Sequence, residues 1–419
     1  MKRKPKTLAM ILAGGRVDDL GVLTFHRPKS AIPFGGFTRI IDFSLSNLMN
    51  SGLERVAILS QYRSYSLINH IGIGSAWDMI GRYRGISVLP PYQGYGNSQW
   101  YRGSSDAVYQ NLDFVDYLNP EQLLILSGDH IYQMDYREII NYHREKDADL
   151  TMACLKVPMD EAHRFGVADI DDEDGELGGR VVRYSEKPAS PEFNWASMTV
   201  FCFKPKVLYE VLESNNREAT SHEFGRDIIP RMMHENRRVF GYKFKGYWGY
   251  TGTIEEFRQA NMDMLGVDPP INFVDWNIRT NLEHRNIRDC QPLKIGNNAQ
   301  ISDSLIYNGC IIEGEVEHSI LFPGTYVEKG AKVKDSVLFF KNAVGKGALL
   351  DRIISDVNTT FGSGVRIGEE TKSGSKATTV IGWNNFIKAN TIIGSGCTVH
   401  PSLPSEKIPK QIEPGEVVR

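Results

Sequence analysis

The sequence predicts two domains, an α/β domain on a mainly parallel sheet followed by a left-handed parallel β-helix. Three observations carry this prediction. Short apolar runs alternate with longer helical patterns from residue 8 to about residue 265, as they do in βαβ units. A proline pair at 269–270 interrupts the alternation. A shorter repeat with a different period begins near residue 295, which is typical of stacked coils.

The length of the chain also favours two domains. Its 419 residues exceed what one hydrophobic core usually organises. The segment between the two patterns is polar and has no sustained periodicity. We therefore expect an α/β domain at 1–265, a linker at 266–294 and a β-helix at 295–419.

Elements of the first domain are assigned from their apolar patterns. The strand-like runs are 8–12, 56–59, 123–126 and 150–155. A helix is expected over 40–51, where apolar residues recur at helical spacing. Gly52 follows this stretch at the position of a helix C-cap.

The second domain is predicted from two superposed repeats. A serine followed by two aliphatic residues recurs at Ser304, Ser319 and Ser336, at spacings of 15 and 17 residues. An aliphatic residue followed by glycine recurs within a roughly six-residue period, at 295–296, 344–345 and 367–368. Such a period fills a triangular prism from inside, and stacked coils bury one another's faces. An ordinary β-sandwich is the alternative interpretation, which the matching serine units disfavour.

Composition narrows the class of partner. The net charge is −3, so the chain lacks the basic excess that nucleic-acid-binding surfaces leave in composition. Five scattered cysteines form no CxxC pair, and we expect reduced, mostly buried thiols. No stretch approaches the ~20 apolar residues of a membrane span, and the apolar run at 8–13 is a first strand rather than a signal peptide. We expect a cytoplasmic protein that binds small molecules or copies of itself, without nucleic acid or membrane partners.

The first strand leads directly into Gly14 and Gly15, followed by Arg16. Backbone N–H groups in such a turn can approach phosphates because no Cβ stands in the way. A glycine pair after a strand is more often only a turn, so a function depends on its neighbours. We treat Gly14 and Gly15 as candidate nucleotide-binding residues and Arg16 as a candidate catalytic cation.

The following residues, RPKSAIPFGG at 27–36 and RIID at 39–42, resemble the N-terminal signature of the bacterial ADP-glucose pyrophosphorylases, or glucose-1-phosphate adenylyltransferases. This resemblance implies a Rossmann-like nucleotidyltransferase domain. It places Lys29 at a lysine that helps to neutralise the nucleotide phosphates. Residues 99–108, QWYRGSSDAV, are similar to the family's WYxGTADA segment. The similarity gives Tyr101 a substrate contact and places Gly103 and Asp106 at the nucleotide.

A carboxylate follows the buried strand run at 123–126. Asp129 stands at the carboxyl end of that strand, the end at which open α/β sheets bind ligands. Aspartate oxygens suit Mg²⁺, which bridges triphosphate oxygens. A helix cap is the alternative role for a lone strand-end aspartate. Within its segment we take Asp129 as a catalytic residue and metal ligand, with Mg²⁺ as the cofactor.

Three further segments resemble the family's sugar-phosphate site: FGV at 165–167, SEKP at 185–188 and ASM at 196–198. The resemblance implies that Gly166 allows close backbone approach. It also implies that Glu186 and Lys187 contact sugar and phosphate, and that Ser197 contacts the sugar. Without the other motifs, an exposed Glu-Lys-Pro would be read as a solvated loop.

The resemblance has two departures. Asp19 stands where the family's glycine turn carries arginine, and a carboxylate there would repel a triphosphate. Tyr250, in YWGYTGT, stands where the family has a second metal-binding aspartate, and a neutral phenol is a poor Mg²⁺ ligand.

These observations favour transfer of an adenylyl group from ATP to α-D-glucose 1-phosphate, which yields ADP-glucose and pyrophosphate for glycogen- or starch-type glucan synthesis. Two alternatives stay open: a catalytically weak regulatory subunit, and a related enzyme that uses UTP, dTTP or GTP. Acyl transfer by the β-helix is disfavoured, because no convincing catalytic histidine accompanies the coils. The resemblance further implies a homotetramer and a metabolite as allosteric effector.

Overall fold

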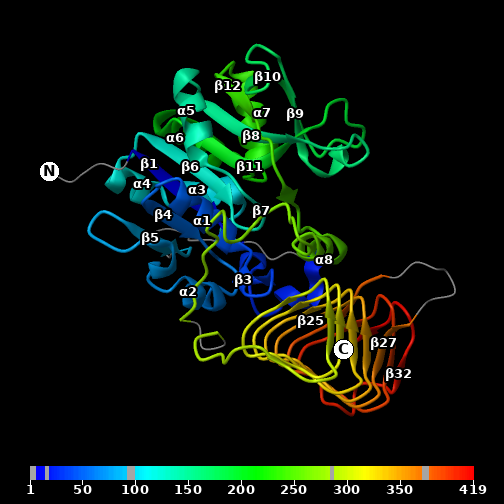
Figure 1. Ribbon diagram of the computed structural model, residues 1–419. Coiled ribbons are helices and arrows are strands. Elements are labelled where there is room, and N and C mark those ends of the chain that lie inside the picture. Colours follow the sequence, from blue (N-terminus) through cyan, green and yellow to red (C-terminus); the bar gives the residue numbers. More distant parts are fainter. Residues whose placement is uncertain (1–5, 15–17, 92–99, 284–286, 370–376) are drawn as a thin grey trace. The chain divides into compact units, whose positions relative to one another are not determined.

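The computed structural model describes residues 6–14, 18–91, 100–283, 287–369 and 377–419. They pack into two compact units, which are not contiguous in sequence (Figure 1). The first unit comprises Met1–Gly15, Phe43–Ser64 and Ile71–Trp248, and the second comprises Arg16–Asp42, Tyr65–His70 and Gly249–Arg419.

The first unit is built on one sheet with the strand order β5-β4-β1-β6-β11-β8-β12-β10-β9. Its strands are β1 (Thr7–Leu12), β4 (Arg55–Leu59), β5 (Gly85–Leu89), β6 (Gln122–Ser127), β8 (Leu150–Lys156), β9 (Gly166–Ile170), β10 (Gly178–Glu186), β11 (Trp195–Phe203) and β12 (Val239–Lys243). All of them except β10 and β11 run in one direction. The prediction of a mainly parallel α/β sheet is therefore confirmed.

Helices, short strands and four 3₁₀ turns make up the rest of the described secondary structure outside the β-helix. The helices are α1 (Ile41–Asn50), α2 (Tyr65–Ile71), α3 (Ser104–Tyr109), α4 (Leu112–Leu118), α5 (Tyr136–Glu145), α6 (Pro205–Asn216), α7 (Ile229–His234), α8 (Ile254–Met262) and the π-helical turn η5 (Phe224–Ile228). The short strands are β2 (Pro33–Phe34), β3 (Thr38–Arg39), β7 (Ile131–Tyr132) and β13 (Trp248–Gly249). The helix expected over 40–51 is α1. Gly52 ends it with a φ of 69°, a left-handed conformation that glycine adopts without strain.

The second unit contains the predicted parallel β-helix, in which three parallel sheets form the three faces of a left-handed coil. One face holds β14 (Lys294–Ile295), β17 (Ile311–Ile312), β20 (Tyr326–Val327), β23 (Ala343–Val344), β26 (Thr360–Phe361) and β29 (Phe386–Ile387). The next holds β15 (Gln300–Ser302), β18 (Glu315–Glu317), β21 (Lys332–Lys334), β24 (Leu349–Asp351), β27 (Arg366–Glu369), β30 (Ile392–Gly394) and β32 (Gln411–Ile412). The third holds β16 (Leu305–Ile306), β19 (Ile320–Leu321), β22 (Val337–Leu338), β25 (Ile353–Ser355), β28 (Thr379–Ile381), β31 (Thr398–Val399) and β33 (Val417–Val418).

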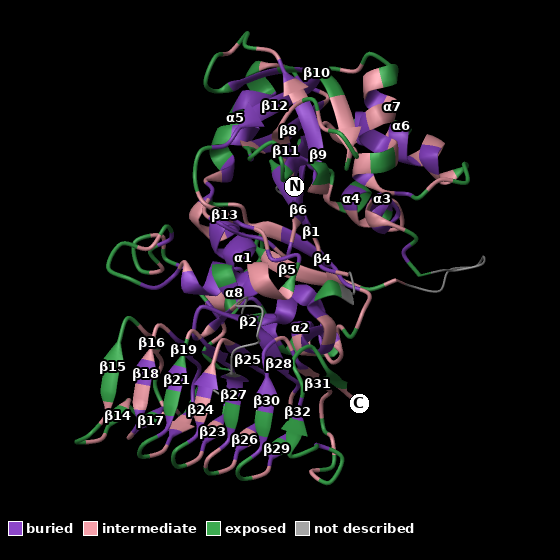
Figure 2. Cartoon of the chain, turned by 90° about the vertical axis from the view of Figure 1, so that its right-hand side faces the viewer, coloured by how far each residue is buried: buried purple, intermediate pink, exposed green. Residues whose placement is uncertain are grey.

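The repeated serines form a hydrogen-bonded ladder along one corner of this coil. The Ser304 hydroxyl accepts the N–H of Ser319, and the Ser319 hydroxyl accepts the N–H of Ser336, each at 3.1 Å. Each hydroxyl also donates to the carbonyl two residues earlier in its own coil. The ladder satisfies backbone groups at a corner where the sheet pairing stops. The stacked coils (Figure 2) confirm the predicted β-helix, and the alternative interpretation as a β-sandwich is wrong.

Long-range packing groups the chain differently from its linear order. In the second unit, the Phe257 ring of α8 lies 6.2 Å from both the Phe34 and the Phe339 ring centroids. Arg27 pairs with Asp356 at 2.6 Å, and both side chains are buried. These contacts explain why N-terminal segments cluster with the coils. The sequence-based division at 1–265, 266–294 and 295–419 stays a prediction about folding domains.

The five cysteines are free in the structure, and four of them are buried. Among the described residues, no helix is long and apolar enough to cross a membrane.

Candidate functional site

The carboxylate of Asp129 lies just beyond the carboxyl end of β6, a central strand whose side chains are mostly buried. The hydroxyl of Ser127 donates to its Oδ1. His130 Nε2 lies 3.5 Å from the same oxygen. The Asp129 side chain keeps 25% of its surface exposed. A rigid strand therefore holds a carboxylate that a ligand can reach.

A divalent metal ion is compatible with this position as part of a substrate complex. Within the described part of the chain, no group of three or more His, Cys, Asp and Glu residues could hold a metal. Mg²⁺ commonly binds through one or two carboxylates, with substrate phosphates and water as the other ligands. Asp129 fits such an arrangement, and it is the residue that would hold the ion.

Contacts between aromatic rings connect His130, the residue after Asp129, with the predicted sugar-binding segments. The His130 ring meets the Trp248 ring edge-on at 5.3 Å between centroids. The Trp248 ring lies 5.2 Å from that of Phe165. The Phe165 carbonyl accepts the backbone N–H of Lys187 at 3.1 Å. Trp248 is not among the site residues that the sequence predicts. Only its position in the YWGYTGT segment indicates that it lies near the site.

Strand β9 brings the predicted sugar-contacting residues together, because it pairs with both β10 and β11. Gly166 lies opposite Glu186 in the register with β10. Val167 lies opposite Ala196 on the other side, so Ser197 is one step from the same point. The register of β11 shifts directly after Ser197, and such irregularities often re-aim a side chain at a site.

The backbone of Lys187 is in an uncommon conformation. Its φ is 45°, and its side chain is exposed. Non-glycine residues in this left-handed region carry a conformational cost and cluster at functional sites. The phosphate contact predicted for Lys187 is compatible with this placement and stays a prediction.

Gly103 and Asp106, which are predicted to bind the nucleotide, are both in close contact with other parts of the protein. Asp106 is buried and accepts from the Arg102 N–H at 2.9 Å and from Gln110 Nε2 at 2.7 Å. A Cβ at Gly103 would lie 2.5 Å from the Ser221 carbonyl oxygen, so close packing requires glycine there. Both residues shape the start of α3, and their nucleotide contacts stay predictions.

Tyr101, the predicted substrate contact, is buried, and its hydroxyl is held inside the protein. The hydroxyl donates to the Leu89 carbonyl at 3.1 Å and accepts from Asn111 Nδ2 at 3.0 Å. The ring can still line a pocket, but the hydroxyl already makes two hydrogen bonds within the protein. Its substrate contact also stays a prediction.

The glycine turn is described only as far as Gly14, because Gly15 and Arg16 lie outside the described residues. A Cβ at Gly14 would lie 3.4 Å from the Gln61 nitrogen, an ordinary contact. Packing therefore does not demand glycine at this position. Close approach of a ligand to the backbone is a reason that would demand it.

In the second unit, the ammonium group of Lys29 lies over the aromatic ring of Tyr250. Lys29 belongs to a 3₁₀ turn, η2 (Lys29–Ala31), and only 3% of its surface is exposed. Its ammonium lies 5.3 Å from the centroid of the Tyr250 ring, within the range of a cation–π interaction. The sequence alone presented Tyr250 as a missing metal ligand and did not predict this contact. Asp19, the other departure, is exposed.

A basic cavity of about 390 Å³ lies within the second unit and is lined by Arg27, Arg39, Lys341 and Trp383, among others. Arg39 donates to the Ser66 hydroxyl at 2.8 Å. Burial, and then the neighbouring positive charge of Arg27, lowers the pKa of Arg39 to about 10. Arg27 is already paired with Asp356, so the positive charge that a bound anion could offset in this cavity is mainly that of Arg39 and Lys341.

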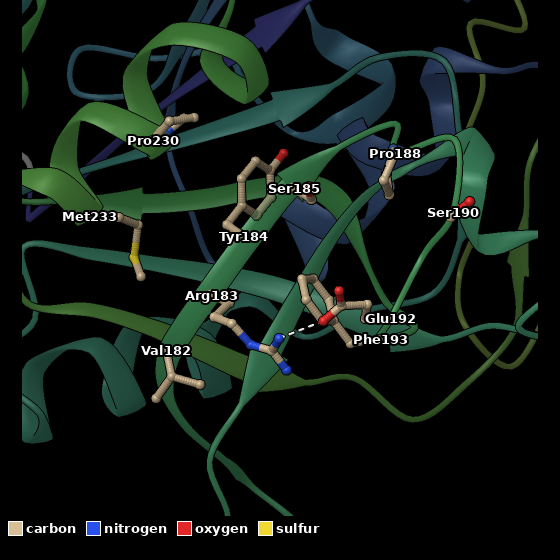
Figure 3. Close-up of a pocket in the computed structure, with 10 residues that line it drawn as sticks. All are labelled: Val182, Arg183, Tyr184, Ser185, Pro188, Ser190, Glu192, Phe193, Pro230 and Met233. Carbon is tan, nitrogen blue, oxygen red and sulfur yellow. Dashed lines mark hydrogen bonds and ion pairs between the residues drawn. The ribbon is translucent and has the colours of Figure 1, made fainter.

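A second cavity, of about 430 Å³, lies in the first unit between β10, α7 and the segment after Lys187 (Figure 3). Val182, Phe193 and Met233 give it an apolar lining. Arg183 and Glu192 form an ion pair of 2.6 Å on its wall.

Comparison with known proteins assigns the chain to a family. Residues 8–266 match the model described as nucleotidyl transferase, and residues 292–383 match the GlmU-like, C-terminal hexapeptide model. A glucose-1-phosphate adenylyltransferase of Desulfitobacterium hafniense (strain Y51) is 41% identical over 397 residues, which cover 94% of this chain and 98% of that protein. Its namesake in Bacillus mycoides (strain KBAB4) is 43% identical over 355 residues, covering 84% and 92%. The one in Fervidobacterium nodosum is 40% identical over 403 residues, covering 94% of each. The chain belongs to the glucose-1-phosphate adenylyltransferase family of nucleotidyl transferases.

Proposed function

We propose that this chain joins ATP and α-D-glucose 1-phosphate to form ADP-glucose and pyrophosphate, for glycogen- or starch-type glucan synthesis. The main support is the convergence of Gly166, Glu186 and Ser197 on β9 and its two neighbours. The names of the relatives, each a glucose-1-phosphate adenylyltransferase, agree with this assignment.

The reaction needs positioning and charge stabilisation more than proton transfer. Glu186, Lys187 and Ser197 orient the sugar phosphate so that its oxygen attacks the α-phosphate of ATP in line. Lys29 stabilises negative charge on the phosphates. Asp129 would hold Mg²⁺, which would neutralise charge on the phosphate oxygens. No covalent intermediate with the protein is required.

An activity panel tests this proposal. The purified chain is assayed with glucose 1-phosphate, Mg²⁺ and, in turn, ATP, UTP, dTTP or GTP. Turnover that is fastest with ATP supports the adenylyltransferase. If turnover is fastest with another nucleotide, the assignment of the nucleotide substrate changes and the type of reaction stays the same. Failure with all four removes the enzymatic function.

The second candidate is a catalytically weak regulatory subunit, which is favoured by the phenol at position 250. Because the ring of Tyr250 faces Lys29, we expect Tyr250→Asp to lower turnover about 10-fold. The new carboxylate would pair with the ammonium that the phosphates need. Steady-state kinetics over a range of Mg²⁺ concentrations measure this effect. A variant with higher turnover and a smaller Mg²⁺ requirement would instead identify a site weakened by substitution, and thus the regulatory subunit.

We propose further that the basic cavity of the second unit binds an anionic metabolite as an allosteric effector. Three cationic side chains line this cavity, those of the buried Arg27, the partly buried Arg39 and Lys341, and they support this assignment. Repeating the activity panel with phosphorylated metabolites at fixed substrate tests it, and unchanged kinetics with all of them contradict it.

We propose that the chain assembles as a cytoplasmic homotetramer through its β-helix. The first two coils support this proposal, because Ile295, Ile301 and Ile311 are exposed aliphatic residues, and exposed apolar surface can mark an interface. Light scattering is expected to give four times the chain mass for the full chain and a lower multiple after deletion of 295–419. A soluble tetramer that persists after the deletion contradicts the assembly role.

A further inference from the structure

The carboxylate of Glu186 sits in a cradle that three separate segments build. Tyr184 Oη donates to Glu186 Oε2 at 2.6 Å. A Cβ at Gly166, which lies opposite in β9, would come within 2.5 Å of the same oxygen. A Cβ at Gly225, in η5, would lie 2.6 Å from Glu186 Cδ. A side chain at either glycine would displace the carboxylate, so all three residues define its position.

The hydrogen bond has a fixed direction. Burial, and then the negative charge of Glu186, raises the pKa of Tyr184 well above its ordinary value. The phenol therefore stays protonated and donates to the carboxylate. Hydrogen bonds of a neutral donor to a charged acceptor are stronger than those between neutral groups.

This bond leaves the two carboxylate oxygens in different situations. Oε2 accepts from Tyr184, whereas Oε1 receives no hydrogen bond from the residues that the structure describes. Glu186 is only partly buried. Oε1 is therefore the oxygen that can accept a hydrogen bond from a ligand hydroxyl.

We propose that Tyr184 is a positioning residue that aims Oε1 of Glu186 at a hydroxyl of the sugar phosphate, and thereby sets selectivity among sugar 1-phosphates. The proposal rests on the function proposed above, because Glu186 is there the sugar contact. Tyr184 acts through Glu186 and does not itself touch the sugar. Tyr184 also lines the cavity of Figure 3.

The test is Tyr184→Phe, which removes one hydroxyl and keeps the ring. The KM for glucose 1-phosphate is expected to rise about 3- to 10-fold, the range of one hydrogen bond. The kcat and the KM for ATP should stay within about 2-fold. The preference in kcat/KM for glucose 1-phosphate over galactose 1-phosphate should fall, because a carboxylate that can rotate discriminates less well between epimers.

Tyr142→Phe is the matched control. Tyr142 also donates its hydroxyl to a carboxylate of the first unit, that of Asp174, at 2.6 Å. It belongs to no part of the predicted site. It should leave all kinetic constants and the sugar preference unchanged. Equal effects of the two tyrosine variants would show a general loss of stability and overturn the proposal.

A double-mutant cycle separates positioning from direct contact. In a Glu186→Ala background, Tyr184→Phe should have no further effect on the KM for glucose 1-phosphate. Independent, multiplying effects of the two substitutions would overturn the proposal, because Tyr184 would then act without Glu186.

A binding measurement distinguishes failure of this proposal from failure of the proposed function. Glucose 1-phosphate should raise the melting temperature of the natural chain more than that of Tyr184→Phe. If the natural chain turns over no nucleotide but shows this difference, the enzymatic function fails and the positioning role stands. Equal shifts in the two proteins, or no shift in either, overturn the positioning role even if turnover is observed.

Discussion

Asp129→Asn is expected to lower turnover by about 10³-fold or more while the fold is kept. The amide preserves the shape of the side chain and can still accept the Ser127 hydrogen bond through its oxygen. It removes the charge that holds a divalent cation against the triphosphate, and that cation supplies several kcal/mol of transition-state stabilisation. Steady-state kinetics at saturating substrates measure the loss, and a melting curve checks the fold. Raising the Mg²⁺ concentration should recover part of the activity.

Asp135→Asn is a suitable control for this variant. Asp135 lies a few residues further on and caps α5 by accepting the Arg137 N–H at 2.9 Å. Its substitution should cost some stability and leave turnover intact. Natural activity of Asp129→Asn at ordinary Mg²⁺ concentrations would show that Asp129 is no metal ligand.

Lys29→Met is expected to lower kcat/KM for ATP by about 10- to 150-fold. Lys29 is buried, and methionine keeps the apolar stem in place while it removes the ammonium. Loss of one charge-assisted phosphate contact costs ~1.5–3 kcal/mol, which corresponds to that range. The effect is measured at varied ATP and saturating glucose 1-phosphate, with the melting temperature as the check on folding.

Lys243→Met provides the comparison. Lys243 is also buried and also faces an aromatic ring, that of Trp195, at 5.5 Å from its centroid. It pairs with Asp172 at 2.8 Å and has no predicted contact with phosphate. If both lysine variants lost the same activity, the effect of Lys29→Met would come from disturbed packing, and the catalytic role of Lys29 would be wrong.

Much of the fold could be predicted because its determinants are local. The four strand-like runs lie within β1, β4, β6 and β8, where buried strands need unbroken apolar residues. The serine repeat is equally local, since each coil of a solenoid contacts mainly its neighbours. The candidate site is predictable to a lesser extent. The sequence places Asp129 at a strand end and Glu186, Lys187 and Ser197 by resemblance, and β9 accounts for the convergence of Gly166, Glu186 and Ser197.

The sequence by itself determined the fold class and the period of the coils, because these are properties of consecutive residues. The resemblance to the family's motifs also marked the two departures at Asp19 and Tyr250. Only the tertiary structure decided which distant residues share one environment. It places Lys29 against Tyr250 and Gly225 against Glu186, and it groups Arg16–Asp42 with the coils. The physical reason is that packing and hydrogen bonding depend on distance in space. No local pattern of apolar or polar residues records which segments the folded chain brings within a few ångströms of one another.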